Sequence, residues 1–257
     1  MFRICCIILQ LTLLLFLSFI RVSAQLPAGD ETSPLMKADS LSAGNIYRYE
    51  TKPSRAAFAH DSERLVYAPR QLLAPGLLAA AGMATFFNQK EGLKNELVEY
   101  RADHFSSFRT KVDNYLQFSP LIANYVLEGL GIPGRTDPAN QAVIMLKSEA
   151  IMLGTTYLLK TSVDERRPDA SNHQSFPSGH TAQAFMAATV LSQQYGYRYN
   201  CLPYAAYTMA AGTGLLRMAN NKHYICDVLA GAAIGILSVK IAYWTHRYHW
   251  GKHAIRR

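Results

Sequence analysis

Residues 160–227 contain three short polar clusters, which read 160-KTSVDERRP-168, 177-PSGH-180 and 217-RMANNKHYICD-227. Around these clusters the chain is apolar for long runs, in which valine, isoleucine and tyrosine do not alternate with polar residues. Such runs predict helices rather than strands, because a half-buried strand alternates apolar and polar side chains. We therefore expect an all-α fold, a helical bundle with about six core helices.

The predicted helices differ in how much charge they carry. The first has no charged residue and is expected to be buried or embedded in lipid, whereas the second is rich in charge and is expected to be an amphipathic helix at a surface. The helices are predicted over residues 71–89, 90–112, 116–131, 142–159, 181–195, 202–216 and 225–247.

The N-terminus predicts export. Arg3 precedes an apolar run over residues 4–20, and Val22 and Ala24 are the small residues that a signal peptidase accepts, so residues 1–24 are interpreted as a signal peptide. An uncleaved N-terminal anchor is the alternative. Residues 25–70 are expected to form a polar exported arm with a short helix near 55–64, residues 71–250 one catalytic domain, and residues 251–257 a basic tail.

Membrane embedding has evidence on both sides. Uncharged windows occur at 71–89 and 199–216, with shorter ones at 181–197 and 228–239, yet the mean hydropathy is only −0.02. If the arm and the first cluster both face the periplasm, an even number of spans separates them. We expect two, with the segment around Glu128 as the weakest candidate. This predicts an inner-membrane protein with a periplasmic site, and a soluble periplasmic bundle is the alternative.

The net charge indicates which classes of partner to expect, and the placement of the cysteines indicates whether a disulfide forms. The formal net charge of +8 favours anionic partners such as phosphorylated lipids or a membrane surface. Nucleic acid is not expected as a partner, because no basic run is interleaved with exposed aromatic residues. Cys201 and Cys226 would each begin a helix, and in antiparallel neighbouring helices the two cysteines would lie about 20 Å or more apart. No disulfide is therefore expected between them.

No metal site is predicted. Neither Cys201 nor Cys226 stands at the spacing from other possible ligands that metal sites show. His246, His249 and His253 recur at helical spacing, but they are interpreted as part of a basic, aromatic C-terminal region at a membrane edge. The sequence leaves the oligomeric state open.

The first two clusters supply cations and a helix N-terminus. Lys160 and Arg167 can turn inward on one anion, since the chain leaves the helix between them. Ser178 and Gly179 are expected at the start of the helix that follows, where free backbone N–H groups favour a phosphate. His180 is then placed to give a proton to a leaving oxygen.

The third cluster supplies a nucleophile. His223 and Asp227 stand four residues apart on one face of a helix start, so the carboxylate can accept a hydrogen bond from one imidazole nitrogen and leave the other free to attack phosphorus. Arg217 brings a third cation. Taken singly, the clusters also fit a solvated loop, an ordinary N-cap and a surface ion pair.

Together the clusters resemble the three-part signature of the type 2 phosphatidic acid phosphatase superfamily, which also includes the vanadium haloperoxidases. The resemblance covers roughly residues 116–246. It implies that His223 is the nucleophile, Asp227 its orienting partner and His180 the general acid. It further implies that the phosphate oxygens are held by Lys160, Arg167, Ser178, Gly179 and Arg217. The chain departs from the pattern at Leu216, where the family often has serine.

The resemblance implies a metal-independent phosphatase with no cofactor. We expect it to remove phosphate from an envelope lipid through a phosphohistidine, with phosphatidic acid, phosphatidylglycerol phosphate, isoprenyl pyrophosphate and lipid A as possible substrates. A soluble periplasmic acid phosphatase of broad specificity is the first alternative. A non-catalytic helical protein that only binds phospholipid is the second.

Overall fold

The structure is a computed structural model that describes residues 68–88 and 92–247. All of these residues belong to one compact unit, 53–257. Within them the regular elements are helices, so the predicted all-α class is confirmed. The signal peptide, most of the polar arm, the helix near 55–64 and the basic tail lie outside the described residues.

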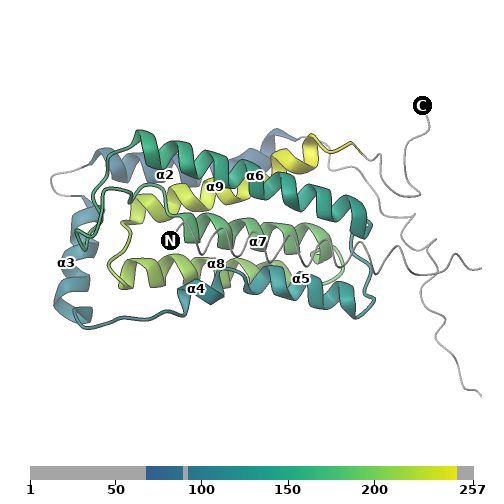
Figure 1. The fold of residues 1–257 in the computed structure, drawn as a ribbon, viewed down its shortest axis with the longest axis horizontal. Coiled ribbons are helices and arrows are strands. Elements are labelled where there is room, and N and C mark those ends of the chain that lie inside the picture. Colours follow the sequence, from purple (N-terminus) through teal and green to yellow (C-terminus); the bar gives the residue numbers. More distant parts are fainter. Residues whose placement is uncertain (1–67, 89–91, 248–257) are drawn as a thin grey trace, which may run out of the picture. The chain divides into compact units, whose positions relative to one another are not determined.

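Most of the described helices run lengthwise, and α3 lies across one end of the bundle (Figure 1). The helices are a short 3-10 helix η2 (Pro69–Leu72), α2 (Leu73–Phe87), α3 (Leu93–Phe105), α4 (Asp113–Leu116), α5 (Ser119–Gly129), α6 (Pro138–Ser162), α7 (Gly179–Tyr195), α8 (Leu202–Ala219) and α9 (Ile225–Trp244).

Helix α7 is the centre of the bundle. Twelve of its 17 residues are buried, and it packs against α5, α6, α8 and α9. Its contact with α9 is unusually close: a Cβ atom at Gly235 would lie 2.3 Å from the carbonyl oxygen of Ala182, and one at Gly231 would lie 2.5 Å from that of Ser178. Only glycine permits this approach, which brings the first turns of α7 and α9 together.

Two helix predictions need correction. The helix predicted over 116–131 is α5, which begins only at Ser119, because Pro120 has no backbone N–H and fits the first turn of a helix. The short helix α4 ends at Leu116, before it. The helix predicted over 90–112 ends at Phe105. The chain turns away there, and Arg109 donates to the carbonyl oxygens of Ser106 and Phe108.

The expected two membrane spans between the arm and the first cluster stay a prediction, and the structure shows how the helices in this part of the chain run. Helix α2 starts beside the end of α9, where Trp244 Nε1 donates to Gln71 Oε1 at 3.0 Å. It ends beside the loop of the second cluster, where the rings of Phe86 and Phe176 lie 5.2 Å apart. Helices α5 and α6 then run back and forth along the bundle before Lys160 (Figure 1).

Not all of these helices are long enough to cross a bilayer by themselves. The 11 residues of α5 extend over about 16 Å, roughly half of a hydrocarbon core. Within the described residues, two helices are long and apolar enough to span, α6 and α9. In the most apolar window of α9, 61% of the residues are buried inside the bundle, against 28% for α6.

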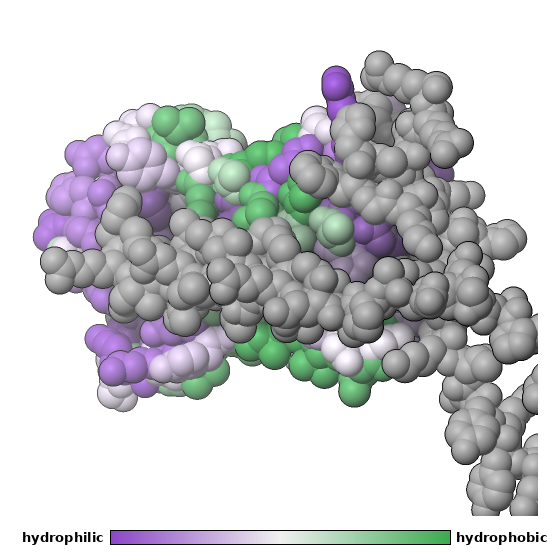
Figure 2. Space-filling model, turned by 45° about the vertical axis from the view of Figure 1, so that its right-hand side comes forward, coloured by the Kyte–Doolittle hydropathy of each residue, from purple (hydrophilic) through white to green (hydrophobic). Residues whose placement is uncertain are grey.

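Large apolar side chains lie on the outside of the bundle. Figure 2 shows apolar surface over its middle and hydrophilic residues gathered at the end where α3 lies. The helices α2, α5, α6 and α8 all contribute leucines or isoleucines that are more than half exposed, among them Leu73, Leu77, Ile122, Leu130, Leu158 and Leu215. An outward apolar surface of this kind is unusual for a protein in water.

Two remaining expectations concern cysteine and histidine. Cys201 is exposed and Cys226 buried, and both are free thiols, as predicted. His246 was assigned to a C-terminal region at a membrane edge, but it is buried in the bundle, and its Nε2 atom lies 2.7 Å from Oδ1 of Asn140. His249 and His253 lie outside the described residues.

Candidate active site

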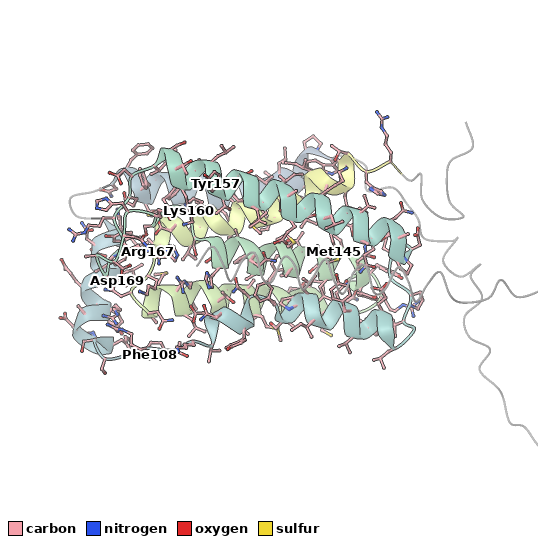
Figure 3. The ribbon with its side chains drawn as sticks, viewed as in Figure 1. Phe108, Met145, Tyr157, Lys160, Arg167 and Asp169 are labelled. Carbon is pink, nitrogen blue, oxygen red and sulfur yellow. The ribbon has the colours of Figure 1, made fainter. Side chains whose placement is uncertain are left out.

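The first cluster lies at the end of α6 and in the loop that follows. Lys160 is in the last turn of α6, and its Nζ donates to the backbone carbonyl of Gln174 at 2.9 Å. The loop folds back on itself, because Arg167 donates its backbone N–H to Asn172 and is itself 6% exposed. Figure 3 shows Lys160 and Arg167 at the same end of the bundle as α3.

The second cluster forms the start of α7. Ser178 is the N-cap, and its hydroxyl oxygen accepts from the Thr181 backbone N–H at 3.4 Å and from the Thr181 hydroxyl at 2.9 Å. The hydroxyl proton of Ser178 is therefore available to another acceptor. Next to it, a Cβ atom at Gly179 would meet nothing closer than a methyl group of Thr156 at 3.8 Å. The helix N-terminus thus leaves backbone donors open to an anion.

The third cluster joins α8 to α9. Arg217 lies in the last turn of α8, and the chain then turns through Asn221 with φ of 60°. Lys222 forms an ion pair with Asp169 of the first cluster, and the Asp169 backbone N–H donates to the carbonyl of Asn221 at 3.1 Å. These contacts hold the loops of the first and third clusters side by side.

His223 and Asp227 form a buried pair. The Nδ1 atom of His223 lies 3.3 Å from Oδ2 of Asp227, and the two side chains are 1% and 0% exposed. The same Oδ2 accepts from the Tyr224 backbone N–H at 2.9 Å and from the hydroxyl of Ser175. With Nδ1 facing the carboxylate, Nε2 is the imidazole nitrogen left for chemistry.

The electrostatics show that the clusters converge on one place. The pKa of His180 is lowered to about 3, mainly by burial and in addition by the nearby Arg217, His223, Arg167 and Lys160. Burial also lowers the pKa of His223 to about 4, although the carboxylate of Asp227 opposes that shift. Both rings are therefore neutral near pH 7 in the empty site.

The cations have unused donors. The Nε atoms of Arg167 and Arg217 are buried and have no hydrogen-bond partner among the described residues. Burial and the nearby Arg217 lower the pKa of Arg167. Buried donors without partners and like charges in proximity are costly, so this arrangement favours an anion that would satisfy both.

A comparison with protein families gives the same picture from the sequence. Residues 141–251, which contain all three clusters, match the family model described as the PAP2 superfamily. This part of the chain belongs to the PAP2 superfamily.

Individual relatives are also similar. A lipid A 1-phosphatase of Porphyromonas gingivalis is 32% identical over 239 residues, which are 92% of this chain and 49% of that protein. The chain thus spans about half the length of this curated relative.

Two solved structures are similar as well. The crystal structure of Aquifex aeolicus LpxE is 23% identical, with a TM-score of 0.46, over 60% of this chain and 97% of that one. The first transmembrane PAP2 type phosphatidylglycerolphosphate phosphatase from Bacillus subtilis is 17% identical, with a TM-score of 0.43, over 66% and 94%.

Four residues that contact the PAP2 clusters were missed by the sequence analysis. Asp113 accepts from Arg217 Nη1 at 2.7 Å, and Asn114 Oδ1 lies 2.8 Å from His180 Nε2. Lys94 forms an ion pair with Glu165 and lies 4.2 Å from the ring centroid of Tyr224. Three of them, Lys94, Asp113 and Asn114, precede the matched residues 141–251, and no local pattern marks them. The fourth, Ser175, lies two residues before Pro177, just outside the second cluster.

In the described part of the chain, histidine, cysteine, aspartate and glutamate do not gather in groups of three or more that could hold a metal ion. The positive charges near His180 are those of Lys160, Arg167 and Arg217.

Proposed function

We propose that the protein is a phosphatase that removes phosphate from a phosphorylated envelope lipid, with the 1-phosphate of lipid A as the first candidate. The observation that carries the proposal is that Lys160, Arg167 and Arg217 lie near enough to His180 to lower its pKa, and that Lys160 and Arg217 do the same to His223. An anion site alone needs the cations, but it needs neither a buried His–Asp pair nor a second imidazole.

The first step of the proposed reaction forms a phosphohistidine. A bound phosphate dianion offsets the charge of the nearby cations, so His180 is protonated in the complex although it is neutral in the empty site. His223 Nε2 attacks the phosphorus while the bond from phosphorus to the lipid oxygen breaks, and the His180 imidazolium gives that oxygen a proton. Asp227 stabilises the positive charge that develops on the His223 ring. The guanidinium groups and the backbone N–H groups at the start of α7 stabilise the charge on the phosphoryl oxygens.

The second step releases phosphate. Neutral His180 takes a proton from water, the water oxygen attacks phosphorus, and the bond from phosphorus to His223 Nε2 breaks. His180 is then protonated and His223 neutral, so both are ready for another turnover. All of these roles are assigned to side chains and to the backbone N–H groups at the start of α7, and no step requires a metal ion.

Substrate and location have separate support. The curated relative from Porphyromonas gingivalis is named as a lipid A 1-phosphatase. The exposed leucines and isoleucines of α2, α5, α6 and α8 fit acyl chains around the bundle, and the polar end holds the site (Figure 2). We propose an inner-membrane protein with its site at the periplasmic interface, which fits an envelope lipid better than a soluble ester.

The test is phosphate release by the full-length protein, purified in detergent, from a panel of substrates. The panel contains lipid A, phosphatidic acid, phosphatidylglycerol phosphate, an isoprenyl pyrophosphate and one soluble ester. We expect release from lipid A, with loss of one phosphate seen by mass spectrometry, and at least a thousandfold slower release by His223→Ala. Equal release by both proteins would refute the enzymatic proposal.

Two further results separate the alternatives. A preference for the soluble ester, together with extraction from membranes by high salt alone, would favour the soluble acid phosphatase. An acid-labile phosphoryl group trapped on wild-type protein but not on His223→Ala is expected for a phosphohistidine.

A further inference from the structure

Asn114 contacts the candidate general acid from outside the PAP2 match. It lies in α4, 66 residues before His180, and its Oδ1 accepts from His180 Nε2 at 2.8 Å. The matched stretch begins only at residue 141. The contact therefore comes from a part of the chain that the three clusters do not include.

The segment that carries Asn114 is held firmly. Thr110 and Asn220 exchange two hydrogen bonds, from the Thr110 backbone N–H to Asn220 Oδ1 at 2.8 Å and from Asn220 Nδ2 to the Thr110 carbonyl at 2.9 Å. Asp113 is 1% exposed and binds Arg217 at the end of α8. These contacts fix α4 against α8, so Asn114 is oriented before any substrate binds.

The two histidines of the site are thus tethered differently. His223 is held at Nδ1 by a carboxylate, which leaves Nε2 to attack. His180 is held at Nε2 by a neutral amide, which leaves Nδ1 as the nitrogen that can exchange a proton with substrate. We propose that Asn114 is the positioning residue of the general acid, holding the His180 ring by Nε2 so that Nδ1 delivers the proton to the leaving lipid oxygen. The inference rests on the proposed function.

The choice of an amide rather than a carboxylate has a physical reason. The nucleophile becomes positively charged when it is phosphorylated, so a carboxylate partner stabilises its product. The acid must lose its proton in the transition state, and a carboxylate at Nε2 would hold that proton more tightly. The amide orients the ring and adds no charge to the site. The groups already near the His180 ring are Arg217, Arg167, Lys160 and His223, and Asp113 on α4 lies beside Arg217.

The proposal predicts a dependence on the leaving group. Dodecyl phosphate and 4-dodecylphenyl phosphate carry the same alkyl chain, but one releases an alkanol and the other a phenol, whose pKa is about 10. The phenolate leaves with little help from an acid. We expect Asn114→Ala to lower kcat/KM for dodecyl phosphate about a hundredfold and for 4-dodecylphenyl phosphate less than about fivefold. We compare kcat/KM because it reports the steps up to and including phosphoryl transfer to His223. The later hydrolysis of the phosphohistidine does not affect it.

A second variant and a control guard against loss of structure. Asn114→Asp keeps the shape of the side chain and is expected to move the alkaline limb of the kcat/KM profile for dodecyl phosphate upward by about one pH unit. Tyr115→Ala removes an exposed neighbour on α4 and is expected to leave both esters unaffected. Equal losses on both esters in Asn114→Ala, with an unshifted pH profile in Asn114→Asp, would overturn the proposal. Inactivity of wild-type protein toward both esters and lipid A would instead remove the proposed function itself.

Discussion

The backbone N–H of Ser178 donates to the backbone carbonyl of Asp227 at 3.0 Å. This bond joins the N-cap of α7 to the first turn of α9, and so fixes the anion-binding helix start relative to the His223–Asp227 pair. Because it involves backbone atoms, its geometry depends on how closely the two helices approach rather than on any one side chain.

Replacing Gly231 by alanine should therefore impair the site. The new Cβ atom would lie 2.5 Å from the Ser178 carbonyl oxygen, so α9 must move away from α7. We expect at least a tenfold loss of phosphate release and a lower Tm. The control is Gly154→Ala in α6, where a Cβ meets nothing within 4 Å and the substitution should stabilise the helix by about 0.5–1 kcal/mol. Equal behaviour of the two variants would contradict this account of the contact.

Removing the Ser175 hydroxyl should slow the reaction without unfolding the protein. Its hydrogen bond helps to hold the Asp227 carboxylate that faces His223. We expect Ser175→Ala to lower kcat about tenfold, since partners that orient a catalytic side chain typically have effects of this size. Ser192→Ala, at the other end of α7, removes a hydroxyl bonded to a backbone carbonyl and is expected to retain wild-type kcat. An unchanged kcat in Ser175→Ala would show that Asp227 needs no such support.

The ion pair between Lys94 and Glu165 should matter for stability. Their side chains are 10% and 16% exposed, so Lys94→Met leaves a carboxylate largely buried without its cation. We expect a loss of about 3 kcal/mol in the free energy of unfolding. The double variant Lys94→Met/Glu165→Gln should recover much of it, because no charge is then left unpaired. Thermal unfolding of the wild type, Lys94→Met, Glu165→Gln and the double variant tests this coupling, and simple additivity of the two single effects would argue against it.

The two histidines predict acid sensitivity. Their pKa values are about 3 and about 4 in the folded protein, below the ordinary value near 6.5, so the unfolded chain binds more protons as the pH falls. Stability is therefore unaffected above about pH 7 and is lost as the pH falls from about 6.5 towards 4, by up to about 1.4 kcal/mol per pH unit for each ring.

Thermal unfolding between pH 8 and pH 4.5 checks the sign and the origin of this effect. We expect His180→Gln and His223→Gln each to show a shallower decline of Tm than the wild type over this range. Measurements at pH 8 are the reference, because both rings are neutral there in folded and unfolded chains. Parallel declines in all three proteins would place the acid sensitivity elsewhere.

Much of the fold could be predicted because its signals are local. Runs without alternation predicted helices close to α2, α6, α7, α8 and α9, and Ser178 before Gly179 predicted the start of α7. The start of α5 was predicted too early because the effect of Pro120 was underestimated. Proline favours the first turn of a helix, so α5 begins at Ser119, separate from α4.

By itself, the sequence determined the helical class, the clusters and the helix ends at which they lie, because periodicity and capping depend on residues within a few positions of one another. Only the tertiary structure decided how the helices before Lys160 run along the bundle, and that α4 brings Asp113 to Arg217 and Asn114 to His180 across 104 and 66 residues. Contacts at such separations arise from the packing of α4 and α8, which leaves no periodic or local pattern in the chain.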